Sequence, residues 1–407
     1  MTLDPAALDA ADPLADHRDR FVGADSDLVY LDGNSLGRPL RATVERMGRF
    51  VTDEWGGRLI RGWDERWFEL PLMLGDRLAA AVLGAAAGQT AIGDSTTVLL
   101  YKLVRAAVTA HPGRTEIVID RDNFPTDRYV VEGVARECGL TVRWLDVEPA
   151  GGLTPEALAG VVGEQTALVL VSHVAYRSGW LADAAGITRV AHDAGAWVLL
   201  DLCHSSGAVP VELDAWQVDL AVGCTYKYLN GGPGAPGFGY VARRHLEAEA
   251  FHQPVWGWMG SADPFAMGQG YSPAAGIRRL ISGTPPVVGM LALEDMVDLL
   301  AEVGIDAVRQ KSVALTSYVI DLVDRDLPQV ALASPREPGG RGGHVTIDHP
   351  AMRGVTTALW RRDVLPDFRN PDGLRLGLSP LTTSFAEVAA GVAAIATELA
   401  ALEQVRP

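Results

Sequence analysis

The chain has 407 residues, of which 48% are hydrophobic and 21% are charged, so it can bury a large core and is not globally disordered. Its 51 acidic residues outnumber its 35 basic residues and give a net charge of −16. This charge argues against nucleic acid as a partner, because phosphate neutralisation needs clustered Lys and Arg. The length fits two or three domains, or one large α/β domain with a smaller one appended.

The ends of the sequence and its cysteines show no pattern of secretion, membrane insertion or metal binding. The first twenty residues lack the apolar core of a signal peptide, and the most apolar stretch, residues 388–402, predicts an amphipathic closing helix. Cys138, Cys203 and Cys224 are odd in number and have no CxxC spacing, which argues against a disulfide framework or a zinc site. We therefore expect a cytoplasmic protein with no metal site and no membrane partner.

Residues 1–50 predict an N-terminal arm and a first helix, with a turn-rich segment before that helix. Residues 51–285 predict a large α/β domain, since short apolar runs alternate there with helical patterns such as 183–195. Continuous apolar runs are typical of strands that helices cover on both faces, as in a mainly parallel sheet. The strand-sized runs lie at 116–120, 141–146, 167–172, 197–201, 219–224 and 238–242.

Residues 286–407 predict a smaller C-terminal α+β domain. Helical patterns cover 285–303 and 306–324, and a Pro/Gly-rich loop follows at 335–344. A short mixed region then leads to the closing helix.

Three side chains that could carry chemistry fall just after predicted strands. Asp201 ends one strand, His204 follows it, and Lys227 comes just after the next strand, between Tyr226 and Tyr228. Ligands of parallel sheets bind outside the carboxyl ends of the strands. A lysine in apolar and aromatic surroundings can form a Schiff base, and a carboxylate one strand away suits a pyridinium nitrogen. Taken singly, these residues also fit a helix cap, a satisfied polar group and a surface lysine.

Two further segments are weaker signals. Ser95, Thr96 and Thr97 precede a helical pattern and could bind a phosphate, although such clusters are usually helix caps. Phe124 and Asp127 follow a strand and could stack on a ring and orient it, although the segment alone reads as a turn. The GxGxxG at 232–237 contains two prolines and runs into a strand, so it is not a dinucleotide fingerprint.

Taken together, the motifs resemble those of the kynureninases, of the bacterial type, which are pyridoxal-phosphate enzymes of fold type I. The resemblance implies a mainly parallel, seven-stranded type of sheet, a small C-terminal domain and a homodimer with shared active sites. It rests on nine segments in order: YLDGNSLGRPL (30–40), LIRGW (59–63), DSTTV (94–98), NFPTD (123–127), DLCHSSGAVPVELD (201–214), GCTYKYLNGGPG (223–234), VWGWMG (255–260), ISGTPP (281–286) and FRNPDGLRLGLSPLTTS (368–384).

The resemblance also implies roles for individual residues. Lys227 would hold pyridoxal phosphate, Asp201 would pair with its ring nitrogen, and Tyr226 would be the acid/base of the hydration step. Arg375 would bind the substrate α-carboxylate, with three further substrate residues: Asn34, Ser35 and Trp63. The remaining cofactor shell would be Thr96, Thr97, Phe124, Asp127, Ser172, His204, Trp256 and Thr284, of which Trp256 and Thr284 would come from the neighbouring subunit.

The implied reaction is hydrolysis of L-kynurenine to anthranilate and L-alanine by Cβ–Cγ cleavage, in tryptophan catabolism and NAD biosynthesis. The same chemistry on 3-hydroxy- or ring-substituted kynurenine stays open, because Ser261 and Cys203 replace a histidine and an alanine usual in the family. Another fold type I lyase, such as a cysteine desulfurase, is the chief rival. A non-catalytic or scaffold protein would be expected to have lost Lys227 or Arg375, and both are present.

Overall fold

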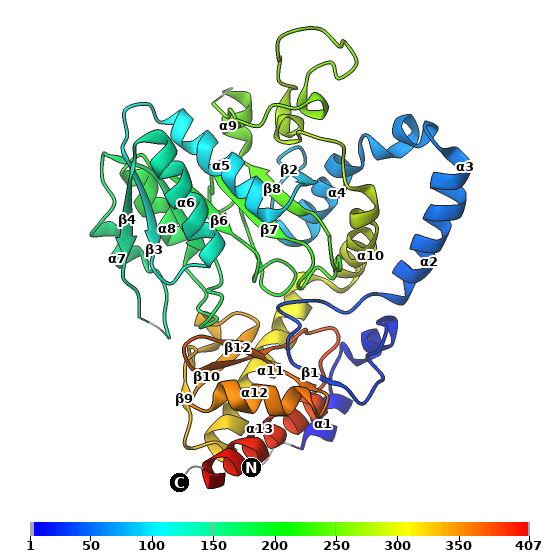
Figure 1. Ribbon diagram of the computed structural model, residues 1–407, viewed down its shortest axis with the longest axis vertical. Coiled ribbons are helices and arrows are strands. Elements are labelled where there is room, and N and C mark those ends of the chain that lie inside the picture. Colours follow the sequence, from blue (N-terminus) through cyan, green and yellow to red (C-terminus); the bar gives the residue numbers. More distant parts are fainter. Residues whose placement is uncertain (1–3, 149, 249, 406–407) are drawn as a thin grey trace.

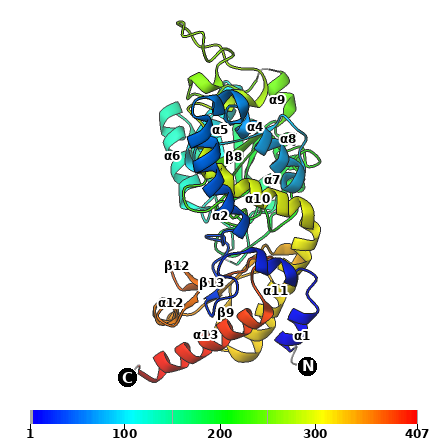
Figure 2. The ribbon, with the colours of Figure 1, turned by 90° about the vertical axis from the view of Figure 1, so that its right-hand side faces the viewer.

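The computed structural model describes residues 4–148, 150–248 and 250–405. A larger α/β unit lies above a smaller unit in Figure 1, and both ends of the chain lie at the smaller unit. Figure 2 shows that a segment between α9 (Arg243–Glu247) and α10 (Val287–Val303) projects from the larger unit, at the end away from the smaller unit.

The larger unit is built on a seven-stranded sheet in the order β2-β8-β7-β6-β5-β3-β4. Only the pairings of β8 are antiparallel, so the predicted mainly parallel sheet is confirmed. Six strands lie within one residue of their predicted bounds, and β2 had no predicted counterpart because its run is only four residues long. The strands are β2 (Thr90–Gly93), β3 (Glu116–Asp120), β4 (Thr141–Leu145), β5 (Thr166–Ser172), β6 (Trp197–Asp201), β7 (Leu220–Cys224) and β8 (Gly237–Val241).

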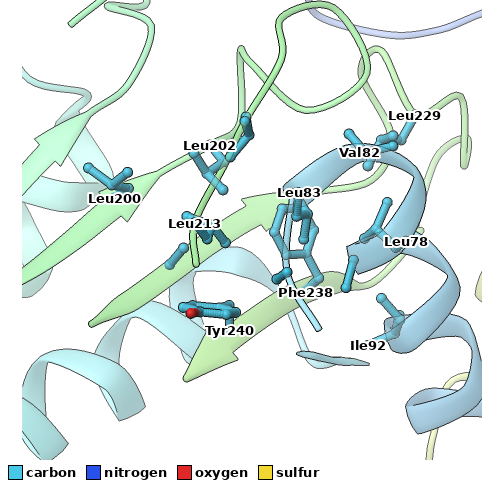
Figure 3. Close-up of a cluster of buried hydrophobic side chains, with 14 of the residues drawn as sticks. Leu78, Val82, Leu83, Ile92, Leu200, Leu202, Leu213, Leu229, Phe238 and Tyr240 are labelled. Carbon is cyan, nitrogen blue, oxygen red and sulfur yellow. The ribbon is translucent and has the colours of Figure 1, made fainter. Parts of the chain in front are cut away.

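Helices cover both faces of this sheet, which explains the continuous apolar runs. Successive strand residues enter two different cores: Val198 and Leu200 face one side, and Leu199 faces the other. In Figure 3, Leu78 from the helical layer packs beside Phe238 of β8. The first face carries α4 (Leu70–Leu78), α7 (Pro155–Ala159), α8 (Ala184–Asp193) and α10, and the second carries α5 (Thr96–Ala110) and α6 (Pro125–Cys138).

The N-terminal segment connects the two units. Helix α1 (Pro5–Ala10) packs on α13 (Phe385–Val405), and β1 (Val29–Tyr30) pairs in parallel with β11 (Val364–Leu365) of the smaller unit. Helix α2 (Arg41–Arg49) then packs against α10 of the larger unit, and it continues through wider turns at Phe50–Trp55 into α3 (Gly56–Arg58). Two more wide helical turns follow, at Trp63–Trp67 and Ala79–Leu83.

The smaller unit has an antiparallel sheet in the order β12-β13-β10-β9, packed against helices. Helix α13 is long and apolar enough to cross a membrane by length and composition alone. In the fold, 33% of its 18-residue apolar window is buried, and the helix packs on α11 and α12. The elements are β9 (Ala331–Leu332), β10 (His344–Asp348), β12 (Asp367–Arg369), β13 (Gly373–Gly377), α11 (Ile305–Asp326), α12 (Met352–Trp360) and α13.

The predicted domain boundaries at residues 50 and 285 stay predictions. Within the fold, side chains of α10 belong to the core of the larger unit, whereas α11 enters the core of the smaller unit from Leu315 onward. The change in packing therefore comes within α11, between Val308, which still belongs to the larger core, and Leu315. Gly304, with a φ of +82°, separates α10 from α11.

The buried carboxylate of Asp219 connects several segments at the edge of the sheet opposite the carboxyl ends of the strands. Asp219 accepts hydrogen bonds from Val198 N at 2.7 Å, His192 Nε2 at 2.8 Å and His245 Nε2 at 2.7 Å, and Arg244 adds an ion pair. Burial alone would raise the pKa of Asp219, but these donors outweigh it and hold the pKa below the usual range. The two histidines are therefore structural partners of Asp219.

Candidate active site

The carboxyl ends of the parallel strands bring the main predicted residues to one edge of the sheet. Ser172 ends β5 and is in register with Asp201, which ends β6. Lys227 comes three residues after Cys224, the last residue of the neighbouring β7. Short strands that all end at this edge position an amine, a carboxylate and a hydroxyl around one space.

Lys227 and His204 form the buried polar contact of this edge. Lys227 is 9% exposed, His204 is 5% exposed, and the lysine Nζ lies 3.2 Å from the imidazole Nε2. Burial, reinforced by the charges of Lys227 and Arg375, holds the pKa of His204 well below its usual value. The imidazole is therefore neutral and can accept a hydrogen bond from the lysine. A surface position for Lys227 is ruled out.

Phe124 faces the same space from the start of α6. Its ring centre lies 5.8 Å from Lys227 Nζ, and its edge meets Tyr176 at a centroid distance of 5.4 Å. The interpretation of this segment as a plain turn is wrong. Pro125 opens α6 at its first position, where the missing N–H and fixed φ of proline are favourable. The start of this helix therefore places the ring beside the lysine.

Asp127, in the first turn of α6, is a buried acid next to Asp201. It is 1% exposed, and its Oδ2 has no hydrogen-bond partner among the described residues when the group is a carboxylate. Burial and the neighbouring Asp201 raise the pKa of Asp127 well above its usual value. Asp127 therefore keeps its proton and can donate it to Asp201, whose Oδ1 also accepts from Cys203 N at 2.8 Å.

The N-terminus of α5 forms the anion-binding side of the edge. Ser95 caps the helix by accepting from Val98 N, and Thr96 and Thr97 occupy its first turn. The first N–H groups of a helix have no intrahelical acceptor and favour a negative charge. Ser95 and Thr284 line one cavity of about 410 Å³ at this point.

Arg375 enters from β13 of the smaller unit and is 1% exposed. Its Nη1 donates to the carbonyl oxygen of Tyr176 at 2.7 Å, and its Nη2 donates to Ser35 Oγ at 2.8 Å. In the amide orientation that satisfies both ends, Asn34 accepts from Arg375 Nε at 3.1 Å. The structure therefore brings together three of the four predicted substrate residues.

Two carboxylates already surround this guanidinium. Asp367 lies 2.7 Å and Asp32 lies 3.8 Å from Arg375 Nη2. Burial and then the charge of Asp367, offset in part by Ser35 and by Arg375 itself, raise the pKa of Asp32 to about 6. A substrate carboxylate would meet an arginine that is held in position but already shared.

Tyr226 precedes the buried Lys227 and is itself 36% exposed. Burial, and then the neighbouring thiols of Cys224 and Cys203, raise the pKa of its phenol above the usual value, so the phenol keeps its proton near neutrality. Its carbonyl oxygen accepts from Gly37 N at 3.0 Å, which connects the lysine segment to the turn-rich segment near residue 35.

Three predicted residues lie apart from this cluster within the single chain. Trp63 packs edge-on against Trp67, with ring centres 5.5 Å apart. Trp256 is 68% exposed and stacks on Tyr271 in the projecting segment. Thr284 is exposed at the cavity that it shares with Ser95. The roles implied for these three residues therefore stay predictions.

Sequence reasoning missed three residues at the edge. His344, at the start of β10, is fully buried 5.6 Å from the His204 ring, and neither ring nitrogen has a hydrogen-bond partner among the described residues. Asn123 accepts from Ser172 Oγ at 2.9 Å, and Asp367 pairs with Arg375. A signal existed only for Asn123, which lies inside NFPTD; the other two come from distant strands.

The edge fits pyridoxal phosphate, the cofactor that the sequence resemblance implies. A buried amine, a facing aromatic ring and a helix N-terminus match its aldehyde, its planar ring and its phosphate. Asp127 and Asp201 add a buried acid and a buried carboxylate to the same edge, and the carboxylate suits the ring nitrogen. Among the described residues, no group of three or more His, Cys, Asp or Glu side chains could hold a metal ion.

Comparison with solved structures shows the fold. The chain superposes on an apo cysteine desulfurase from Thermococcus onnurineus NA1 with a TM-score of 0.80 at 18% identity, covering 94% of this chain and 97% of that one. The cysteine desulfurase CsdA from Escherichia coli gives a TM-score of 0.80 at 18% identity, covering 100% of both chains. At such identities, the likeness establishes a common fold, and this fold is that of the predicted fold type I enzymes.

Comparison of sequences shows the family. Residues 308–395 match the family model of the kynureninase C-terminal domain. A kynureninase from Burkholderia pseudomallei (strain 1106a) is 43% identical over 392 residues, which cover 94% of this chain and 91% of that protein. A kynureninase from Pseudomonas fluorescens is 40% identical over 394 residues, covering 95% and 92%. With this identity over nearly the whole chain, and with the buried lysine at the edge of its sheet, the protein belongs to the kynureninase family.

Proposed function

We propose that the protein uses pyridoxal phosphate to hydrolyse L-kynurenine to anthranilate and L-alanine. The observation that carries the proposal is the contact of the buried Lys227 amine with a neutral His204, at an edge that Arg375 enters from the smaller unit. Membership of the kynureninase family indicates the substrate, and the residues at this edge offer a binding position for each end of that substrate.

Arg375 binds the α-carboxylate of the amino acid. A guanidinium suits this task because its planar fork can donate two parallel hydrogen bonds to a carboxylate. Ser35 and the Tyr176 carbonyl hold the guanidinium in place, so little side-chain freedom is lost when substrate binds. Asp367 must share Arg375 with the incoming carboxylate. Arg369, whose Nε lies 2.6 Å from Asp367, compensates the charge of Asp367.

Lys227 holds the cofactor and moves the proton at the substrate α-carbon. Pyridoxal phosphate, when bound, supplies an electron-withdrawing ring that stabilises negative charge on the carbons of the amino acid. Asp201 would stabilise a positive charge on the ring nitrogen, and the proton on Asp127 would orient Asp201 by a hydrogen bond. The neutral His204 accepts a hydrogen bond from the lysine and keeps a further positive charge away from it.

Tyr226 acts at the other end of the substrate. Its phenol keeps its proton near neutrality, so it can donate that proton to the γ-carbonyl oxygen while water adds to the γ-carbon. Cleavage of the Cβ–Cγ bond then leaves the oxygen of water in the carboxyl group of anthranilate, and Cβ takes a proton to become the methyl group of alanine. The partial exposure of Tyr226 leaves this end of the site open to water.

The first test is anthranilate fluorescence after L-kynurenine is added to protein loaded with pyridoxal phosphate, with 3-hydroxykynurenine in parallel. A higher kcat/KM for kynurenine supports the proposal, and a higher kcat/KM for the hydroxylated substrate moves it to the ring-substituted alternative. Absence of turnover with both substrates, while the cofactor remains bound, contradicts it. Lys227→Ala should abolish turnover and the absorbance band of the bound cofactor near ~420 nm.

A cysteine desulfurase or a related lyase is the second candidate, and the solved structures that share the fold are its specific support. Such an enzyme needs a cysteine on a mobile loop over the cofactor. Here Cys138 ends α6, Cys224 ends β7, and Cys203 lies directly after β6 beside Asp201. Release of sulfide from L-cysteine without turnover of kynurenine would favour this candidate.

We also propose a homodimer in which each subunit completes the site of the other. Exposed apolar side chains gather in two places on the single chain, and burial of both in a dimer would remove them from water. Trp256 belongs to one of these places and Thr284 opens onto a cavity, as residues that serve a neighbouring site would. The exposed residues are Val44, Met47, Val51, Trp55, Leu59 and Ile60 around α2 and α3, and Val255, Trp256, Trp258, Phe265 and Met267 in the projecting segment.

Mixing two inactive variants tests this sharing. Lys227→Ala and Trp256→Ala proteins, unfolded together and refolded, should recover activity at about a quarter of the sites if Trp256 acts across the interface of a two-fold dimer. If Trp256 serves its own subunit, the mixture stays inactive. Sedimentation of the wild-type protein gives the oligomeric state independently, and a monomer would contradict the proposal.

We further propose that the enzyme is cytoplasmic and binds neither nucleic acid nor membranes. The net charge of −16 and the packing of α13 against α11 and α12 support this. Cell fractionation tests it, and recovery of the protein in the membrane fraction would contradict it.

A further inference from the structure

A second buried lysine lies close to the site but has no part in the mechanism above. Lys102 is in the second turn of α5, and its side chain is 0% exposed. Its Nζ donates to Asp94 Oδ2 at 2.6 Å and to the carbonyl oxygen of Leu280 at 2.8 Å. Burying an ammonium is unfavourable unless it is paired, so the position of Lys102 in the core depends on these two acceptors.

The first partner, Asp94, belongs to the turn that starts the anion-binding helix. Its φ of +47° is in the left-handed region, which is uncommon for a residue other than glycine. Its carbonyl oxygen accepts from Gly237 N of β8 at 2.9 Å. Lys102 and β8 together therefore hold the residue that precedes Ser95 in this conformation, and with it the direction of the first N–H groups of α5.

The second partner, Leu280, begins the segment that leads to Thr284. Two residues later, Ser282 donates through its Oγ to the carbonyl oxygen of Val255 at 2.5 Å, next to Trp256. The segment that carries Thr284 and the segment that carries Trp256 therefore both approach the larger unit near the Leu280 carbonyl. Asp94, Leu280 and Thr284 line the same cavity of about 410 Å³.

We propose that Lys102 is a positioning residue for the cofactor phosphate. One ammonium joins the start of the anion-binding helix to the segment that carries Thr284. It thereby fixes the direction of the first N–H groups of α5 and, in the proposed dimer, the position from which Thr284 reaches the neighbouring site. The inference rests on the proposed use of pyridoxal phosphate. It adds to that function a residue that touches neither cofactor nor substrate and acts through Asp94 and Leu280.

The chain offers a matched control. Lys311 in α11 is also buried, pairs with the buried Asp12, and has its pKa lowered by burial, as Lys102 does. It lies in the smaller unit, over the ring of Phe385. Lys102→Met and Lys311→Met therefore each remove the ammonium of a lysine–aspartate pair, and only Lys102 belongs to the anion-binding helix.

The experiment compares pyridoxal phosphate with pyridoxal, which lacks the phosphate. The dissociation constants of both are measured by absorbance titration of apoprotein, and the melting temperature of each apoprotein is measured beside them. In Lys102→Met, affinity for pyridoxal phosphate should fall at least about tenfold more than affinity for pyridoxal, because the phosphate loses part of its charge-assisted hydrogen bonding. Lys311→Met should lower the melting temperature and leave the ratio of the two affinities unchanged.

An unchanged ratio in a folded Lys102→Met protein would overturn the proposal and leave Lys102 a structural residue. If that variant does not fold, Asp94→Asn provides the test. Asparagine tolerates the left-handed conformation but weakens the ion pair, so the ratio should shift in the same direction by a smaller factor. No shift in Asp94→Asn would then overturn the proposal. Equal affinity of the wild-type protein for the two ligands would instead contradict the cofactor assignment itself.

Discussion

Replacement of Arg375 by lysine tests the substrate end of the site while keeping its charge. Arg375→Ala is a poorer perturbation, because it would leave Asp367 and Asp32 facing each other without the arginine, and an uncompensated buried charge costs about 3–5 kcal/mol. Lysine has one point charge in place of a planar fork, so it cannot serve Asp367 and the substrate carboxylate at the same time.

The expected loss follows from the contacts. One charge-assisted hydrogen bond to the substrate carboxylate is worth about 1.5–3 kcal/mol, which corresponds to a fall in kcat/KM of roughly 10- to 150-fold. Because the α-carboxylate is bound before and during the reaction, most of this loss should appear as a raised KM. Ser35→Ala removes one neutral support of the guanidinium, at 2.8 Å, and should cost about 0.5–1.5 kcal/mol, or roughly 2- to 12-fold.

The assay is steady-state anthranilate fluorescence over a range of kynurenine concentrations, with the absorbance of the bound cofactor as a check on the other end of the site. Both variants should keep that absorbance. A folded Arg375→Lys protein with kcat/KM within about threefold of wild type would refute the reasoning, because the arginine would then not bind the substrate.

Three further predictions concern stability, measured by urea unfolding. Tyr228→Phe removes the 2.9 Å hydrogen bond from the phenol to the Gly343 carbonyl. Because this carbonyl keeps a second donor, the free energy of unfolding should fall by only about 1 kcal/mol. Tyr129→Phe, at an exposed position, is the control, and equal stability of the two variants would contradict the prediction. Asp219→Asn should lower the free energy of unfolding by at least about 2 kcal/mol at pH 7. Since the pKa of Asp219 is depressed in the folded state, the wild-type protein should be the more stable of the two above pH ~4 and should lose this advantage as the pH falls further. A stability difference that does not change with pH would contradict this. The pKa of Asp32 is raised to about 6 in the folded state, so its pH dependence has the opposite sign. Its contribution to stability is full below pH ~4 and is lost as the pH rises through 6. Asp32→Asn should therefore flatten the dependence of stability on pH between these values, and an unchanged dependence would contradict this.

Local sequence patterns were sufficient for much of the large sheet. Six apolar runs predicted six strands within one residue. Five of these runs are nearly uninterrupted apolar segments that must be covered on both faces, and the exception is β4 at the edge of the sheet, where only Leu145 is buried. The same patterns placed Asp201 and Lys227 at strand ends, and topology alone then brought them to one edge. The GCTYKYLNGGPG segment and the order of the other motifs also identified the family, which the 43% identity over 94% of the chain confirms.

Packing between distant segments decided what the patterns could not. Arg375 meets Ser35 across 340 residues of sequence, and only the docking of the smaller unit makes them neighbours. The full burial of Lys102 and the proton on Asp127 are likewise properties of their surroundings, since each depends on groups that other elements bring into contact.

The sequence by itself therefore determined the strands, the reactive lysine and the family, because hydrophobic runs and motifs are local and can be recognised without the tertiary structure. Only the tertiary structure decided which carboxyl group keeps a proton, which lysine is buried as a structural pair, and which carboxylates share Arg375. Burial and charge proximity set these properties, and both arise only when segments far apart in the chain exclude water from the same space.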